Sequence, residues 1–410
     1  MESSAIRSVR PSPTLAADAR VRQKIAAGED VLHLAFGEAG LPVLPTVAEA
    51  LARGSGDNRY GAVAGSAEAR TAAAGYLSRR GLPTGPEQVV FAPGSKPLLY
   101  ALLNVLPGDV VLPCPSWVSY AAQAELAGKH VVSVPIGEAG GVPDCVALEE
   151  AARPGALVLT LPDNPTGAVA SPEIVREIAA IAEGAGLAIV SDEIYRDLAF
   201  DDEFLSPAEV LPERTIVTSG LSKSMALGGW RIGFARMPDS ELGRSLGNAV
   251  AGLASEVWSS LAAPMQHVAA YVLSEPQEVR DHVAASRRLH RAVSLAAWER
   301  LTGAGVECRR PGGGFYLYPD FEPLRGRLGI ETADGLAELL LERFGIAVLS
   351  GPAFGDRPDG LRFRMATSLL YGRGDEQRWE ALASDDPAAL PWIAAALDRL
   401  EAAVSTIARS

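Results

Sequence analysis

The sequence predicts an α/β fold: a large domain with a mainly parallel seven-stranded sheet flanked by helices, plus a smaller α+β domain. Short apolar runs alternate with Ala- and Leu-rich helical stretches through the middle of the chain. Several of these runs are apolar throughout, as strands buried on both faces are. This succession of strands and helices is typical of a parallel sheet with helices on both faces. After about Ser286 the alternation stops, which indicates a second unit.

Seven apolar runs supply the strands of the large domain, namely residues 89–92, 110–113, 130–135, 157–161, 188–191, 215–218 and 232–235. Helical windows lie between them, at 97–106, 118–126 and 172–185. In the smaller domain we expect helices at 287–301 and 333–344 and short strands at 306–309, 315–319, 346–349 and 361–366.

The length of 410 residues is too great for one ordinary core. We expect an N-terminal arm at 1–40 that belongs to the small domain together with residues 291–410. The large domain then spans 41–290. Residues 369–391 are interpreted as a surface insertion.

Composition disfavours several classes of protein. The formal net charge of −13 repels nucleic acid and anionic membrane surfaces. Residues 1–22 contain no apolar run of signal-peptide length, and no apolar stretch of the chain approaches membrane-span length, so a cytoplasmic protein is expected. Its three cysteines are too widely spaced for a zinc motif, and no metal site is expected.

Ligands in such sheets bind at the carboxyl ends of the strands. Gly94, Trp117, Asn164, Asp192 and Lys223 each follow a predicted strand, and so they are the candidates for chemistry.

The segment GLSKSMALGGWRIG, residues 220–233, is the most informative in the chain. A lysine amine can condense with an aldehyde, and the fork of Arg231 suits a phosphate. The segment resembles, position for position, the pyridoxal-phosphate (PLP) attachment signature of the class I aminotransferases. The resemblance runs from about residue 12 to residue 368. It implies that Lys223 forms the Schiff base to the cofactor, and that Ser222 and Arg231 bind the cofactor as well.

The same resemblance assigns roles around the cofactor ring. In SDEIY, residues 191–195, Asp192 would keep the ring nitrogen protonated and Tyr195 would hydrogen-bond the phenolic oxygen; with Lys223 they are the predicted catalytic residues. Asn164, in a family-like Asn-Pro-Thr-Gly turn, would reach the same oxygen. Taken alone, Asp192 could equally cap a helix, and the Asn164 segment would be an ordinary turn.

A phosphate site and a stacking residue are also implied. The turn PGSK, residues 93–96, ends a strand and opens a helix, whose N-terminus favours an anion. The backbone N–H groups of Gly94, Ser95 and Lys96 would hold the cofactor phosphate, so the Lys96 side chain need not take part. Trp117, in PSWVSY, would stack on the ring, although a Trp there could be core.

For the substrate, the resemblance assigns Gly37, Trp117, Asn164 and Arg362, the last to the α-carboxylate. Arg364 stands where the family pattern has a small polar residue. Two arginines at a spacing of two on one strand face the same way, so geometry alone does not exclude Arg364.

Tyr60, in the segment Arg59-Tyr60-Gly61, resembles a family tyrosine that reaches the neighbouring subunit's phosphate. This implies a homodimer with shared active sites. The alternative is an exposed loop tyrosine.

The predicted function is transfer of the amino group of an L-amino acid to a 2-oxo acid through a Lys223 aldimine, in amino acid metabolism. A PLP-dependent lyase, cyclase or oxidase would use the same residues and stays an alternative. A PLP-sensing regulator would need a basic DNA-binding extension, which the chain lacks. Dicarboxylate-preferring relatives often have a basic residue on the helix after the phosphate turn. Asn104 there weakens an aspartate-specific interpretation without excluding it.

Overall fold

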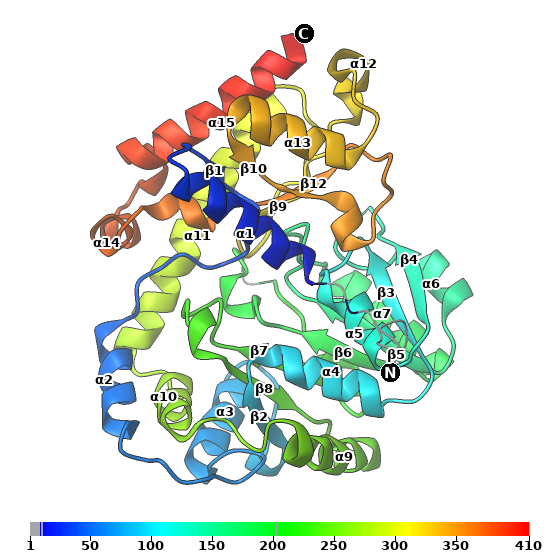
Figure 1. Cartoon of the computed structure of the whole chain (residues 1–410). Helices are drawn as coiled ribbons and strands as arrows, with labels where there is room; N and C mark the ends of the chain where they lie inside the picture. The colour runs from blue at the N-terminus through cyan, green and yellow to red at the C-terminus, as the bar shows by residue number, and fades with distance from the viewer. Residues whose placement is uncertain (1–8, 10, 139, 202, 410) are drawn as a thin grey trace, which may run out of the picture.

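The structure is a computed structural model that describes residues 9, 11–138, 140–201 and 203–409. Its centre is a seven-stranded sheet (Figure 1). In chain order the strands are β2 (Val89–Pro93), β3 (Asp109–Cys114), β4 (Val131–Pro135), β5 (Gly155–Thr160), β6 (Ala188–Asp192), β7 (Thr215–Gly220) and β8 (Ile232–Arg236). They lie in the order β2-β8-β7-β6-β5-β3-β4, and β8 alone is antiparallel to both of its neighbours. The predicted mainly parallel sheet is confirmed.

Helices cover both faces of this sheet, which explains the apolar strands. Every residue of β5, β6, β7 and β8 is buried. Along β5, Ala156 and Val158 face one core while Leu157 and Leu159 face the other, because successive side chains point to opposite faces. The first face is covered by α4 (Ser95–Val105), α5 (Ser119–Leu126) and α9 (Glu241–Val257). The second is covered by α3 (Ala67–Ser78), α6 (Cys145–Ala151), α7 (Pro172–Ala185), α8 (Pro207–Val210) and α10 (Ala263–Leu273), with α2 (Pro45–Gly54) packed against α10.

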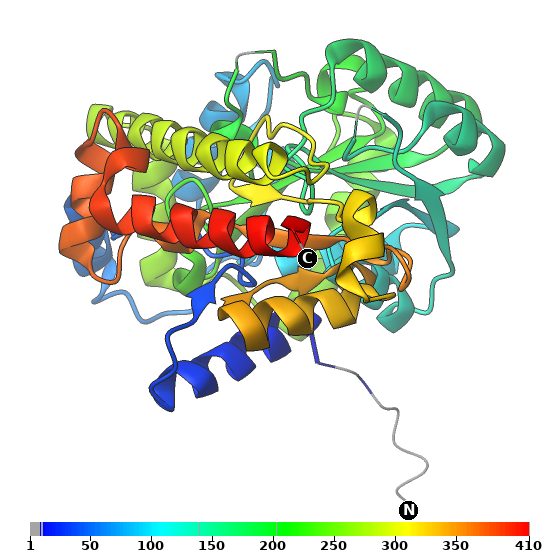
Figure 2. The same ribbon diagram turned by 90° about the horizontal axis from the view of Figure 1, so that it is seen from above.

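The long helix α11 (Gln277–Gly303) connects the sheet region to the rest of the chain (Figure 1). It begins ten residues before the predicted helix at 287–301. In Figure 2 it lies beside α15 (Pro391–Arg409), and both contribute to one core. The expected domain boundary at residue 290 falls inside this continuous helix, and the division of the chain into three segments stays a prediction.

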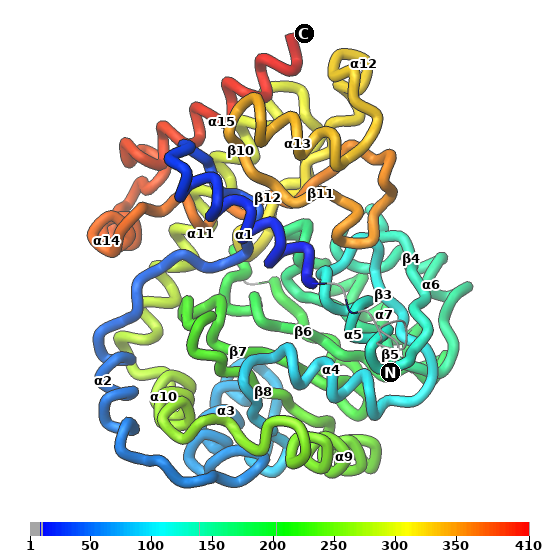
Figure 3. Tube along the Cα trace, in the orientation of Figure 1, coloured from blue at the N-terminus to red at the C-terminus, as the bar shows by residue number. Residues whose placement is uncertain are grey.

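The smaller α+β part has a three-stranded antiparallel sheet of β9 (Tyr316–Leu317), β11 (Leu349–Ser350) and β12 (Phe363–Ala366). A second small sheet pairs β1 (Leu32–His33) with β10 (Ile346–Ala347), so the N-terminal arm joins the C-terminal part as expected. Two helices of this part are α12 (Arg325–Leu328) and α13 (Ala333–Phe344). Helix α1 (Pro13–Ala26) lies near α13 (Figure 3), and Arg20 forms an ion pair of 2.8 Å with Glu338.

Two predictions in this part were wrong. Residues 306–309 form no strand but only a single bridge, between Glu307 and Asp320. Residues 369–391 are not a surface insertion, because α14 (Asp375–Ala383) and the turn before it bury four side chains in the core of this part: Leu370, Tyr371, Ala381 and Leu382.

Within the described ranges, every helix is too short or too polar to cross a lipid bilayer. The cytoplasmic location stays a prediction.

Candidate active site

A cavity of about 410 Å³ lies at the carboxyl ends of β5, β6 and β7, where residues of β9 and β12 close it from the other side. Ten of the predicted site residues line it: Gly37, Ser95, Lys96, Trp117, Asn164, Asp192, Tyr195, Ser222, Lys223 and Arg231. Gly94 lies in the adjoining turn. Two predicted residues, Tyr60 and Arg362, do not line this cavity.

Lys223 follows the end of β7 and extends into the cavity. Its Nζ donates a hydrogen bond of 2.5 Å to the carbonyl of Gly37, and it lies 5.8 Å from the ring centroids of both Tyr195 and Phe315. The amine is thus held between the two parts of the protein, where a ligand in the cavity can reach it.

Asp192, the last residue of β6, is 3% exposed. Its Oδ2 accepts a hydrogen bond of 2.9 Å from the Tyr120 hydroxyl, while its Oδ1 is buried without a partner among the described residues. Burial raises the pKa of this carboxyl from 3.8 to about 6. A buried carboxylate oxygen without a donor points to a ligand N–H that supplies one.

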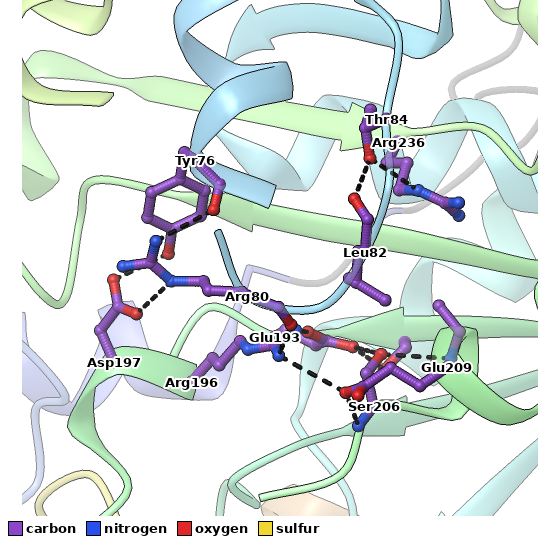
Figure 4. A network of polar contacts seen from close by, with 12 residues as sticks. Tyr76, Arg80, Leu82, Thr84, Glu193, Arg196, Asp197, Ser206, Glu209 and Arg236 are labelled. Carbon is purple, nitrogen blue, oxygen red and sulfur yellow. Dashed lines mark hydrogen bonds and ion pairs between the residues drawn. The ribbon is translucent and has the colours of Figure 1, made fainter. Parts of the chain in front are cut away.

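The residue after Asp192 is fixed by a polar network (Figure 4). Glu193, 2% exposed, accepts hydrogen bonds from the Ser206 hydroxyl and, at 2.8 Å, from Arg196. Arg196 in turn donates to the carbonyl of Arg80 at 2.5 Å. A fully satisfied buried network of this kind is rigid, so the end of β6 presents Asp192 in one position.

An anion cradle lies at the N-terminus of α4. Gly94 has φ +92°, and a Cβ there would lie 2.2 Å from the guanidinium of Arg231. A Cβ on Gly233 would lie 2.2 Å from the backbone N of Ser95, so this close approach also requires glycine. The first amides of an eleven-residue helix and a guanidinium therefore converge on one point, as phosphate binding requires.

Three further predicted residues surround the centre of the cavity. The Tyr195 and Tyr316 hydroxyls are 2.8 Å apart. Asn164 is 3% exposed, and Trp117 packs edge-on against Tyr120 with ring centroids 5.1 Å apart.

The structure places Arg364, rather than the predicted Arg362, in the cavity and so favours Arg364 for the substrate carboxylate. Arg362 pairs with Asp320 at 3.2 Å and Asp356 at 3.1 Å, outside the cavity. Arg364 lines the cavity and is 1% exposed. The side chains of Arg362 and Arg364 point to the same face of the extended chain. Two residues of extended chain span about 7 Å, so Arg362 lies beyond the edge of the cavity.

Arg364 has the contacts of a ligand-binding group. It donates to Asn164 Oδ1 at 3.2 Å and to the carbonyl of Ala35 at 2.7 Å, and its guanidinium lies over the ring of Tyr316. No carboxylate among the described residues forms an ion pair with it. A buried guanidinium of this kind points to an anionic ligand.

Other lining residues were missed by the sequence analysis, and one role was underestimated. Ser12, Thr14 and Leu15 of the N-terminal arm line the cavity, as does Tyr316 of β9. The only local signal for Tyr316 was the Gly-rich run at 312–314 just before it; a Cβ on Gly37 would lie 2.2 Å from the Tyr316 hydroxyl. The Lys96 side chain, which need not take part in a phosphate site built from backbone N–H groups, also lines the cavity.

Each of these groups matches one part of a single small molecule, PLP. The amine of Lys223 matches the aldehyde of PLP, the unpartnered oxygen of Asp192 matches the ring nitrogen, and the cradle at α4 matches the phosphate. The residues present fit this cofactor, and the fold and the cavity define a PLP-dependent enzyme.

Comparison with known proteins specifies the enzyme class. The family model "Aminotransferase class I and II" matches residues 29–369, and the chain belongs to this family. The chain is a PLP-dependent aminotransferase. It is 36% identical to the aspartate/prephenate aminotransferase of Cereibacter sphaeroides, over 92% of this chain and 95% of that protein. It is 32% identical to the aspartate aminotransferase of Geobacillus stearothermophilus, over 89% and 94% respectively.

A solved structure shows the same fold. The aspartate aminotransferase of Thermus thermophilus with maleate superimposes with a TM-score of 0.82 at 31% identity, covering 93% of this chain and 98% of that one.

Proposed function

We propose that the enzyme moves an amino group between a dicarboxylic amino acid, such as aspartate, and a 2-oxo acid. The observation that carries the proposal is the surplus of positive charge in the cavity. Its described lining includes four cationic side chains, those of Lys96, Lys223, Arg231 and Arg364, and one carboxylate, that of Asp192. The aspartate and aspartate/prephenate aminotransferases among the relatives support the same substrate class.

Three of the four cations have a partner once cofactor and substrate bind. Lys223 serves the aldehyde, Arg231 the phosphate and Arg364 the α-carboxylate, which leaves Lys96 for a second carboxylate. Its Nζ lies 5.1 Å from the Trp117 ring centroid. Burial and the positive charges of Arg231 and Lys223 lower the pKa of Lys96. An anionic substrate group beside Lys96 would offset the repulsion between these like charges. Asn104, considered in the sequence analysis, is exposed on α4 and does not line the cavity.

When bound, PLP supplies an electron-withdrawing ring that stabilises negative charge at the substrate α-carbon. Asp192 Oδ1 would hold the proton on the ring nitrogen. Asn164 and Tyr195 would donate to the phenolic oxygen, while Trp117 covers the ring and excludes water. Once displaced from the aldehyde, the amine of Lys223 would carry the proton to and from the α-carbon.

A panel of amino donors tests the substrate roles. Arg364→Lys is expected to raise KM about ten-fold or more for every donor, because lysine cannot make the bidentate carboxylate contact. Lys96→Met is expected to raise KM for aspartate and glutamate about ten-fold and to leave alanine and phenylalanine unchanged. Arg362→Lys is the control, with KM expected to stay near wild type. Single-turnover conversion of the bound cofactor measures each value.

PLP affinity, measured by fluorescence quenching, separates the alternatives for Lys96. If Lys96→Met weakens PLP binding while the order of donors stays the same, Lys96 binds the phosphate and the dicarboxylate proposal is wrong. A larger rise in KM for the amino donors in Arg362→Lys than in Arg364→Lys would show that Arg362 binds the substrate carboxylate, as the sequence analysis predicted.

We further propose a homodimer in which Tyr60 completes the partner's site. Tyr60 is 94% exposed and lies outside its own chain's cavity, on a loop beside Arg59 and His267. An aromatic side chain so exposed suits a contact with a second copy. Sedimentation should give twice the mass of the chain, and Tyr60→Phe should weaken PLP binding without changing that mass. A monomer at micromolar concentration would rule out the shared site.

A further inference from the structure

A row of buried polar side chains runs along α11. His282, Ser286, His290 and Ser294 occur at every fourth residue, and they are 5%, 0%, 0% and 0% exposed, respectively. Residues four apart share one face of a helix. Buried polar side chains are normally held by partners, so this face is packed against something specific.

Three of the four side chains have partners in the segment from Thr367 to Trp379, while the Ser286 hydroxyl has no hydrogen-bond partner among the described residues. The hydroxyls of Ser294 and Thr367 are 2.9 Å apart, and the Nδ1 of His290 lies 2.6 Å from the hydroxyl of Tyr371. The rings of His282 and Trp379 pack with centroids 6.0 Å apart. Most of this segment lies beyond residue 369, where the match to the family model ends.

One ring separates the His290–Tyr371 pair from the cavity. The His290 ring packs on Phe315 with centroids 4.9 Å apart. Phe315 also packs edge-on against Tyr195 with centroids 5.8 Å apart, and Lys223 Nζ lies 5.8 Å from the Phe315 centroid. Phe315 is fully buried in a close-packed core, so a shift of the His290 ring would displace Phe315 and the cavity groups beside it.

The hydrogen bond to Tyr371 is what orients the His290 ring. Burial lowers the pKa of His290 to about 3, so the ring is neutral at physiological pH. Its Nε2 has no partner among the described residues. Tyr371 is itself held in place, since it is fully buried and its carbonyl accepts a hydrogen bond of 3.0 Å from the indole of Trp392.

We propose that His290 and Tyr371 are a positioning pair for transamination: their hydrogen bond holds Phe315 against Lys223 and Tyr195. The pair touches neither substrate nor cofactor. It gives the segment after residue 369 a role in the reaction, which the sequence analysis did not foresee.

Tyr371→Phe tests the pair, because it removes one oxygen and keeps the ring. We expect the pH midpoint of the visible absorbance of the lysine-bound cofactor to shift by about half a pH unit or more, since the Phe315 ring lies beside the Lys223 amine. We expect kcat to fall about ten-fold and KM for the amino donor to change less than about two-fold, because Arg364 binds through other contacts. His290→Leu, which also removes the hydrogen bond, should shift the midpoint in the same direction.

His282→Phe is the matched control. It changes a buried histidine on the same helix that packs against the same segment but has no contact with Phe315. The melting temperature of the cofactor-free protein should change in this variant, with the absorbance midpoint and kcat at wild-type values. If Tyr371→Phe and His290→Leu behave like this control, with altered melting alone, the pair is only structural and the proposal is overturned. Should either variant fail to fold, the other decides the question alone.

Discussion

Replacing Lys223 by alanine is expected to abolish the absorbance band of the lysine-bound cofactor and the half-reaction together. The Nζ of Lys223 is the amine that the structure places in the cavity beside Tyr195 and Phe315. It is proposed both to bind the aldehyde and to carry the proton, so its loss removes two steps at once. A fall in the half-reaction rate of about 10⁴-fold or more is expected, as for other groups that act directly on the reacting atoms. Stopped-flow absorbance after addition of aspartate measures it.

Lys129→Ala is the matched control for this substitution. Lys129 donates to the carbonyl of Leu106, away from the cavity, and its loss should leave absorbance and rate at wild-type values. Because Lys223 is only partly buried and is not packed in an apolar core, Lys223→Ala should still fold and bind PLP non-covalently. A Lys223→Ala protein that turned over at a normal rate would show that another amine does the chemistry.

Local signals explain why much of the fold could be predicted from the sequence. The helix at 172–185 was predicted with its observed bounds, since Ser171 caps it, Pro172 begins it and Gly186 ends it in a left-handed conformation. The strands were equally clear, because helices on both faces make them apolar throughout. Since parallel strands end at one edge of the sheet, a correct set of strands also brought Asn164, Asp192 and Lys223 together.

The errors came from contacts between segments far apart in the chain. The choice between Arg362 and Arg364 depends on where β12 ends relative to the cavity, and nothing in the strand itself records that. Tyr371 appeared to lie in a surface insertion because its partner, His290, is about eighty residues earlier. The Lys96 side chain was set aside because a helix N-terminus explains a phosphate site without it.

Asp192→Asn is expected to preserve the fold and to slow removal of the α-proton by about 10³-fold or more. A neutral amide does not hold a proton on the ring nitrogen, so the cofactor loses its electron-withdrawing power. The fold should survive because an asparagine oxygen can still accept the hydrogen bond from Tyr120. The rate with α-deuterated aspartate would show whether proton removal has become the slow step. A rate within a few-fold of wild type would mean that Asp192 does not serve the ring.

The cofactor-free protein offers a check on Asp192 that does not depend on activity. The pKa of its carboxyl rises from 3.8 to about 6 on folding, because burial disfavours the charge. A raised carboxyl pKa stabilises the folded state at low pH, and that stabilisation is lost as the pH rises through 6. At 1.36 kcal/mol per unit of pKa shift, the loss is about 3 kcal/mol.

Without PLP, Asp192→Asn should therefore melt a few degrees above wild type at pH 8 and nearly level with it at pH 4. With PLP the order at pH 8 should reverse, because the ring N–H then gives the carboxylate the partner that its Oδ1 lacks. If wild type and Asp192→Asn melt at equal temperatures at both pH values, with and without PLP, then Asp192 has neither a raised pKa nor a contact with the ring.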